Sequence, residues 1–235
     1  MNQDHNERLL LKISGEFLGG DQGFGYDIAC LDQLAEDIIS VVELGYQIAL
    51  VIGGGNIVRG KQLTAINQTA ADNVGMLGTL QNAIVVSELL SEKGQNTVVF
   101  SAFQVDKIAR YYTYQAVTKA LKQGRICFLA GGTGNPHFTT DTAAVLRAIE
   151  LNCDLVLKGT NVAGVYSADP KKYPSAQFIK NVTYDVAIAH HLNVMDMTAF
   201  SLAKDYKVPI KVFSIHEKGN LLKAVTSSEI GSLVS

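Results

Sequence analysis

The chain has 235 residues, of which 47% are hydrophobic and 18% charged, and its formal net charge is −2. This composition is typical of a soluble globular protein and excludes an intrinsically disordered chain. The slight negative charge argues against a protein that binds nucleic acid through bulk electrostatics, because such proteins are distinctly basic. Local positive groups would have to meet any anionic ligand.

The cysteines and the first residues indicate a cytoplasmic protein. Cys30, Cys127 and Cys153 are odd in number and lack metal-ligand spacing, which predicts buried, reduced thiols. The first eight residues are polar and acidic, unlike a signal peptide. We also expect no membrane segment, because no apolar run approaches the length needed to span a bilayer.

Residues 9–14, LLLKIS, form an apolar run that predicts a buried parallel strand. Lys12 falls near the carboxyl end of this strand, where open α/β sheets collect their ligands. The alternative is a lysine on an edge strand whose ammonium simply reaches water. Residues 19–25, GGDQGFG, predict a flexible loop, which is most simply a surface hairpin or a linker.

Helical spacing of apolar residues predicts a helix over 28–44, and a second buried strand follows at 48–52. Three consecutive glycines come next, which indicates a place where a ligand approaches the main chain. Gly55 to Gln62 falls short of a P-loop, because Gln62 lacks the hydroxyl that binds the metal ion. We therefore reject a P-loop but retain a glycine loop in which Arg59 suits bidentate contact with phosphate.

A long, mostly apolar helix is predicted over 68–92, with Asp72 near its start. Asp72 is either a favourable charge near the positive helix end or a ligand contact. Three tyrosines, at positions 111, 112 and 114, precede a helix predicted over 114–122. They are expected in the core or a subunit interface rather than in a stacking platform, because only Arg110 adds a basic residue.

Residues 126–130 predict another buried strand, followed by a glycine-rich loop over 131–136. Thr139, Thr140 or Asp141 would then cap a helix over 142–150. A strand, a glycine loop and a capped helix aim backbone N–H groups and a positive dipole end at one point, which is an anion-binding arrangement. The alternative is a tight turn that binds nothing.

The last third continues the alternation of strands and helices. Strands are predicted at 97–100, 155–158 and 210–213, helices at 183–191, 199–206 and 219–225, and a closing strand at the end. The loop over 159–170 carries Tyr166, a candidate clamp for a flat ring, and His190 and His191 lack a partner at metal spacing. The pattern predicts an α/β layered fold with a mainly parallel sheet. A weak division of the chain near residue 150 separates the part with the glycine loop from the part with the candidate ring clamp.

Seven segments together resemble one family. They are LLLKISGE, GFGYDI, VIGGGNIVRG, DNVGML, AGGTGNPHFTTDTAAVLRAIE, GVYSADP and VMDMTAFSLAKD. In this order they resemble the bacterial uridylate kinases of the amino-acid kinase superfamily over nearly the whole chain. The resemblance implies a single three-layer α/β/α sandwich that transfers a phosphoryl group from Mg²⁺-ATP to UMP, giving UDP and ADP in pyrimidine nucleotide biosynthesis.

The resemblance also implies roles for residues at matching positions. Catalysis would rest on Lys12, Arg59 and Asp141. ATP would contact Lys12, Ile13, Ser14, Gly15, Gly55, Arg59, Thr160, Tyr166 and Asp169. UMP would contact Gly54, Asp72, Thr133, Gly134, Asn135, Pro136, His137, Phe138, Thr139 and Thr140. An allosteric GTP site would comprise Gly20, Asp21, Gln22, Gly23, Phe24 and Gly25.

A cytoplasmic homohexamer regulated by GTP or UTP is implied as well, with Mg²⁺ carried by the nucleotide phosphates rather than by protein side chains. Three positions depart from the family pattern: Ala163 replaces an aspartate, and His137 and Val58 stand where aromatic residues are usual. None is assigned to catalysis, so an active enzyme is expected. Whether Asp196 contacts substrate or only caps a helix stays open.

Two alternatives remain. A kinase for an amino-acid carboxylate or carbamate is one, and the GTGNP–FTTD block speaks against it. A non-catalytic nucleotide sensor is the other, and the joint presence of Lys12, Arg59 and Asp141 argues against it.

Overall fold

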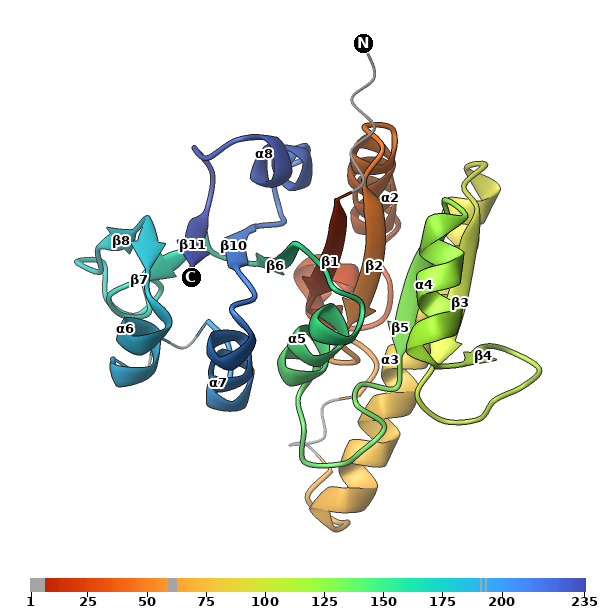
Figure 1. Ribbon diagram of the computed structural model, residues 1–235. Coiled ribbons are helices and arrows are strands. Elements are labelled where there is room, and N and C mark those ends of the chain that lie inside the picture. Colours follow the sequence, from red (N-terminus) through yellow and green to blue (C-terminus); the bar gives the residue numbers. More distant parts are fainter. Residues whose placement is uncertain (1–6, 59–62, 191, 193) are drawn as a thin grey trace.

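The computed structural model describes residues 7–58, 63–190, 192 and 194–235. Within these residues, nine strands form one sheet and two more form a small antiparallel ribbon (Figure 1). The large sheet contains β1 (Arg8–Ile13), β2 (Gln47–Ile52), β3 (Thr97–Ser101), β4 (Arg110–Tyr111), β5 (Ile126–Ala130), β6 (Leu155–Thr160), β9 (Asn181–Val182), β10 (Ile210–Ser214) and β11 (Ser232–Val234). The ribbon pairs β7 (Val165–Tyr166) with β8 (Phe178–Ile179).

The sheet runs in the order β4-β3-β5-β2-β1-β6-β10-β11-β9, and the β10–β11 pair is its antiparallel step. The prediction of a mainly parallel sheet is confirmed. β1 lies at the centre, between β2 and β6, and its register sets Lys12 beside Lys158 of β6. Residues distant in sequence therefore meet at the carboxyl ends of two neighbouring strands, where such sheets bind ligands.

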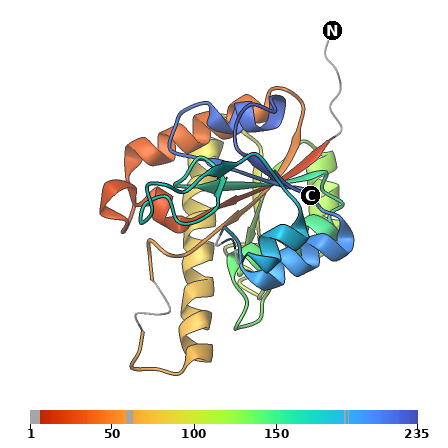
Figure 2. The same cartoon turned by 90° about the vertical axis from the view of Figure 1, so that its left-hand side faces the viewer.

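Helices cover both faces of the sheet (Figure 2). The helices are α1 (Gly15–Leu18), α2 (Ile28–Val42), α3 (Gln68–Glu92), α4 (Tyr114–Lys122), α5 (Thr140–Glu150), α6 (Tyr184–Ala189), α7 (Met197–Tyr206) and α8 (Asn220–Thr226). One apolar core packs α2, α3 and α8 against the sheet, and a second packs α4, α5, α6 and α7 on the opposite face. Apolar residues at helical spacing face each core, which gives the predicted three layers.

Four expectations need correction. The 159–170 segment is not all loop, because Gly159 and Thr160 continue β6 through pairing with β10. Tyr111 and Tyr114 are about half exposed, so of the two places expected for them the core is excluded, while a subunit interface stays a prediction. Cys30 is only half-buried, whereas Cys127 and Cys153 are buried free thiols as predicted.

The fourth correction concerns the expectation that no segment is long and apolar enough to span a membrane. Of the described helices, α3 is long and apolar enough to span a bilayer by length and composition alone. It instead packs along β3 and β5, with Leu80, Val86 and Leu90 buried in a core. A buried helix of a globular protein passes the same test.

Candidate active site

Two lysines and one aspartate form a buried cluster at the carboxyl ends of β1 and β6. Asp141, in the first turn of α5, lies with one carboxylate oxygen 2.6 Å from Lys12 Nζ and the other 2.5 Å from Lys158 Nζ. Lys12 and Lys158 are 7% and 8% exposed. Lys12 and Asp141, both expected to take part in catalysis, are in contact, and Lys158 is a third member that we did not predict from the sequence.

The ionisation of this cluster follows from burial and mutual charge. Burial opposes the charged form of Asp141, but the ammonium groups of Lys12 and Lys158 outweigh it and hold the pKa of the carboxyl below its ordinary value. Burial lowers the pKa of Lys158 to about 8, since the attraction of Asp141 only partly offsets desolvation and the repulsion of Lys12. At neutral pH the cluster carries an excess of positive charge, which suits it to bind an anion.

A signal for Lys158 was present in the sequence. LVLKG repeats the pattern of LLLKIS, an apolar strand with a lysine near its carboxyl end. Only the sheet register, which pairs Lys12 with Lys158, shows that both lysines reach the same point.

The loop after β5, residues 131–138, leads into α5, and hydrogen bonds tie the start of α5 to the start of α7. Thr139 caps α5 by accepting the backbone N–H groups of Asp141 and Thr142. Its hydroxyl in turn donates to Asp196, which also accepts the Thr142 hydroxyl at 2.9 Å. Asp196 caps α7 through the N–H of Ala199, so it is a helix cap that also ties the loop end to α7.

A small cavity of about 160 Å³ lies between this loop and the start of α3, and we call it the acceptor cavity because several of the residues predicted to bind UMP line it. It is lined by Gly54, Gly55, Val58, Ala71, Asp72, Gly75, Met76, Thr79, Gly132, Asn135, Phe138 and Thr140. Figures 1 and 2 both place the loop after β5 beside the first half of α3. Asp72 joins the two, because its carboxylate accepts the backbone N–H of His137 at 2.8 Å and the amide of Gln68 at 2.6 Å.

His137 lies between two residues of the loop that line this cavity, Asn135 and Phe138, but does not line it itself. His137 adopts a positive φ of 69°, and its ring nitrogen lies 3.1 Å from the Thr69 hydroxyl. His137 and Phe138 have exposed side chains, and Thr133 and Asn135 bond to one another within the loop. Of the predicted acceptor residues, Gly54, Asp72, Asn135, Phe138 and Thr140 line the cavity.

The glycines after β1 and β2 allow two loops to touch. A Cβ on Gly15 would lie 2.3 Å from the Gly53 carbonyl oxygen, and a Cβ on Gly54 would lie 2.7 Å from the Gly75 carbonyl oxygen. Side chains at these positions would force the backbones apart. Arg59, predicted in the same loop, lies outside the described residues.

Two adjoining cavities of about 490 and 640 Å³ also border the cluster, and we call them the donor cavities because several of the residues predicted to bind ATP line them. Lys158, Thr160 and Asn161 line both. Lys12 and Ser14 line the first, where Ser14 caps α1; Tyr166 and Asp169 line the second. Of the remaining predicted ATP residues, Ile13 has a fully buried side chain, so only its main chain could meet a ligand.

Tyr166, the candidate clamp for a flat ring, is in contact with another aromatic side chain. Its ring packs edge-on against Phe178 across the β7–β8 ribbon, with centroids 5.5 Å apart. It is nevertheless part of the second cavity wall.

The 20–25 loop borders the first donor cavity, through Gly20, Asp21 and Gly23. It is folded back on itself rather than extended as a linker, because the Gly23 N–H bonds to the carbonyls of Gly19 and Gly20, and the Gly25 N–H to that of Asn56. Phe24 at its tip is 70% exposed.

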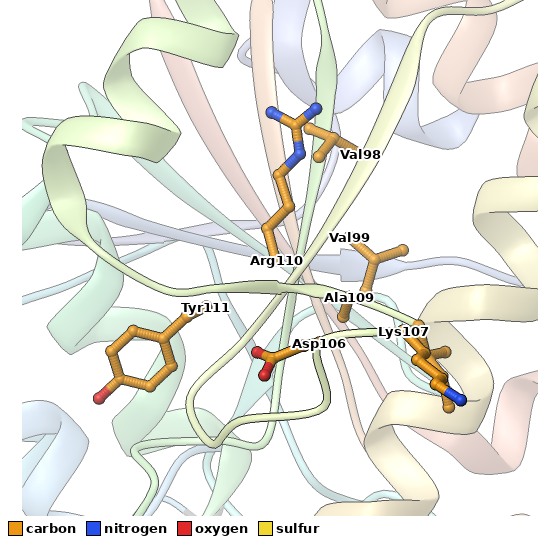
Figure 3. A pocket seen from close by; sticks show the side chains of 8 residues that line it. Val98, Val99, Asp106, Lys107, Ala109, Arg110 and Tyr111 are labelled. Atoms are coloured by element: carbon orange, nitrogen blue, oxygen red, sulfur yellow. The ribbon is translucent and has the colours of Figure 1, made fainter.

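A further hollow lies away from these residues, at the β3–β4 edge of the sheet (Figure 3). Figure 3 shows the guanidinium of Arg110 and the ammonium of Lys107 pointing away from each other. Charged groups that diverge cannot bind one anion together, so the hollow lacks the convergence that the lysine cluster has.

The model of the amino acid kinase family matches residues 7–214. The chain belongs to the amino acid kinase family. A uridylate kinase of Methylococcus capsulatus is 44% identical over 236 residues, covering 100% of this chain and 99% of that protein. The crystal structure of the UMP kinase from Bacillus anthracis matches with a TM-score of 0.93 and 34% identity, covering 97% of this chain and 96% of that one.

The crystal structure of the UMP kinase from Ureaplasma parvum gives a similar match, with a TM-score of 0.92 and 33% identity over 98% of this chain and 99% of that one. These full-length matches place the chain among the uridylate kinases of the amino acid kinase family and confirm the resemblance. The predicted fold is confirmed by the same structures.

Proposed function

We propose that this amino acid kinase family member transfers the γ-phosphoryl group of ATP to UMP, giving UDP and ADP. The observation that carries the proposal is the position of the Lys12–Asp141–Lys158 cluster. Lys158 lines both donor cavities, while Thr140, the neighbour of Asp141, lines the acceptor cavity. The cluster therefore lies between a space for the donor and a space for the acceptor. The names of the relatives support UMP as the acceptor.

Phosphoryl transfer needs alignment and charge neutralisation more than covalent help from the protein. In our proposal Lys12 and Lys158, at the carboxyl ends of β1 and β6, bind the transferred phosphoryl group and neutralise its developing charge. Asp141 holds both ammonium groups in place and accepts no proton, because the attacking oxygen of a nucleoside monophosphate is already ionised at neutral pH. Arg59 is proposed to add a bidentate phosphate contact.

Magnesium would enter with ATP. The described residues contain no group of three or more His, Cys, Asp or Glu side chains that could hold a metal ion, and both oxygens of Asp141 lie against lysines. Mg²⁺ commonly binds through substrate phosphates and water, and it would supply positive charge that offsets the charge of the phosphates.

Further assignments belong to the same proposal. The chain would act as one domain, with the acceptor part before about residue 150 and the ATP part after it. The acceptor cavity supports this division, although Lys12 and Ser14 also line the donor side. The 20–25 loop is proposed to bind GTP as an effector, with UTP as a second effector, in a cytoplasmic homohexamer.

A coupled ADP-release assay tests the function directly. Mg²⁺-ATP is supplied with UMP, CMP, dUMP, aspartate or carbamate as acceptor, with and without GTP. Turnover confined to UMP is expected, and a change on adding GTP would support the effector site. Turnover with aspartate or carbamate alone would move the chain elsewhere in the family. Tight nucleotide binding without any turnover would indicate a sensor and would direct attention to Ala163.

A further inference from the structure

A buried cation, Arg147, lies in α5 outside the lysine cluster. Arg147 is 5% exposed, and its guanidinium has three partners. Nη1 lies 2.7 Å from the carboxylate of Glu150, Cζ lies 3.8 Å above the centre of the Tyr112 ring, and Nη2 donates to the carbonyl oxygen of Gly132 at 3.2 Å. The first two partners belong to the framework, whereas Gly132 belongs to the acceptor loop.

The framework partners fix the direction of the guanidinium. Tyr112 donates its hydroxyl hydrogen to Glu150 at 2.5 Å, so carboxylate, ring and guanidinium form one closed group. A guanidinium is planar and its N–H groups point in fixed directions. With Nη1 held by Glu150 and one face held by Tyr112, the position of Nη2 is set, and so is the carbonyl that it binds.

The contact with Gly132 orients one peptide group of the loop. In a trans peptide the N–H points opposite to the C=O, so the Thr133 N–H is directed away from the buried guanidinium. This N–H has no hydrogen-bond partner among the described residues. Gly132 lines the acceptor cavity and has a φ of 59°, so its backbone is free to turn unless something holds it.

We propose that Arg147 is a positioning residue for the acceptor: it holds the Gly132–Thr133 peptide so that the Thr133 N–H stays available to the bound nucleoside monophosphate. The inference rests on the proposed function. Arg147 acts through the Gly132 carbonyl and does not itself contact the acceptor or the reacting atoms. Its effect is therefore confined to the acceptor side, while the donor cavities do not depend on it.

Arg147→Lys is the variant that tests this. A lysine keeps the charge beside Glu150, but its single ammonium cannot also hold the Gly132 carbonyl. We expect the KM for UMP to rise about tenfold, as small misplacements of a substrate do. The KM for ATP should stay within about twofold of its original value. Arg110→Lys is the matched control, since it makes the same replacement at an exposed arginine of β4, and the KM for UMP should not change.

A second readout needs no substrate. Amide hydrogen exchange in the nucleotide-free protein should be faster across residues 131–139 in Arg147→Lys and unchanged across β6. If Arg147→Lys proves unstable, the double variant Arg147→Met with Glu150→Gln removes both charges and should show the same changes, because it leaves no unpaired buried charge.

Equal rises in both KM values, or unchanged exchange across 131–139, would overturn the positioning role. Absence of UMP turnover in the unaltered protein would instead refute the proposed function. The exchange measurement would then still decide whether Arg147 holds the loop.

Discussion

The acceptor and donor sides of the site are built in different ways. The acceptor cavity, about 160 Å³, is walled by α3 and by the loops after β2 and β5, and the loop after β5 is held by Asp72 in the wall and by Arg147 and Asp196 outside it. Of the donor cavities, the one of about 640 Å³ is lined mainly by the largely exposed 160–173 segment, and the one of about 490 Å³ mainly by residues 12–23 together with Lys158 and Thr160. Substitutions far from the acceptor should thus impair its binding, whereas donor binding should respond mainly to residues in contact.

The largest effect should come from the cluster that both sides share. We expect Lys12→Ala to lower kcat by about 100- to 1000-fold at saturating substrates, because a charge aimed at the transferred group is lost. Steady-state kinetics measures this, with the exposed Lys107→Ala as control. Near-normal turnover would show that Lys12 has no catalytic role.

The second test uses the pH dependence of Lys158. Its pKa of about 8 lies below the ordinary value of 10.5, so its charge is lost as the pH rises through about 8. Turnover should then fall about tenfold per pH unit above that point. In Lys158→Arg the fall should disappear up to about pH 10, because an arginine stays charged.

Unfolding would not account for such a fall. Between about pH 8 and the ordinary lysine pKa, the unfolded chain binds the proton that the folded chain has lost, so the contribution of Lys158 to stability rises with pH. A pH profile identical in the native protein and in Lys158→Arg would rule out Lys158 as the titrating group.

Asp196→Asn sharpens the comparison on the acceptor side. The asparagine oxygen can still cap α7, but the Thr139 hydroxyl, which already accepts two N–H groups, loses its carboxylate acceptor. We expect the KM for UMP to rise about fivefold with little change for ATP. Asp185→Asn, an exposed carboxylate paired with Lys204, is the matched control. A change confined to the KM for ATP would contradict a role of Asp196 on the acceptor side.

The smallest effect should come from Tyr166→Ala on the donor side. Losing one aromatic wall should raise the KM for ATP about threefold and leave the KM for UMP unchanged. Tyr173→Ala, another exposed ring lining the same cavity, shows whether any aromatic there suffices. A rise in the KM for UMP would mean that the donor and acceptor sides are coupled through the β7–β8 ribbon.

Local patterns predicted most of the elements. The helix over 114–122 and the strand over 126–130 agree with α4 and β5, because their apolar residues and caps suffice to define them. β6 was predicted too short, since pairing with β1 and β10 keeps Gly159 extended, and pairing with β10 keeps Thr160 extended, where their own preferences favour a loop.

Local pattern pointed to Lys12, near the carboxyl end of a strand, and to the glycine loop before α5. The catalytic roles of Lys12 and Asp141 came from the resemblance, because Asp141 lies 129 positions away from Lys12 along the chain. Lys158 and Arg147 were not found, because a lysine in a strand and an arginine in a helix look ordinary until the fold shows that both are buried and what they contact.

The central place of β1 has a consequence for how the chain assembles during synthesis. β1 pairs with β2 on one edge, but its other edge waits for β6, more than 140 residues later. Until then the apolar LLLKI strand presents unsatisfied main-chain groups, the kind of edge that invites pairing with another chain. The same pairing brings Lys158 beside Lys12, so activity begins only when that edge is closed.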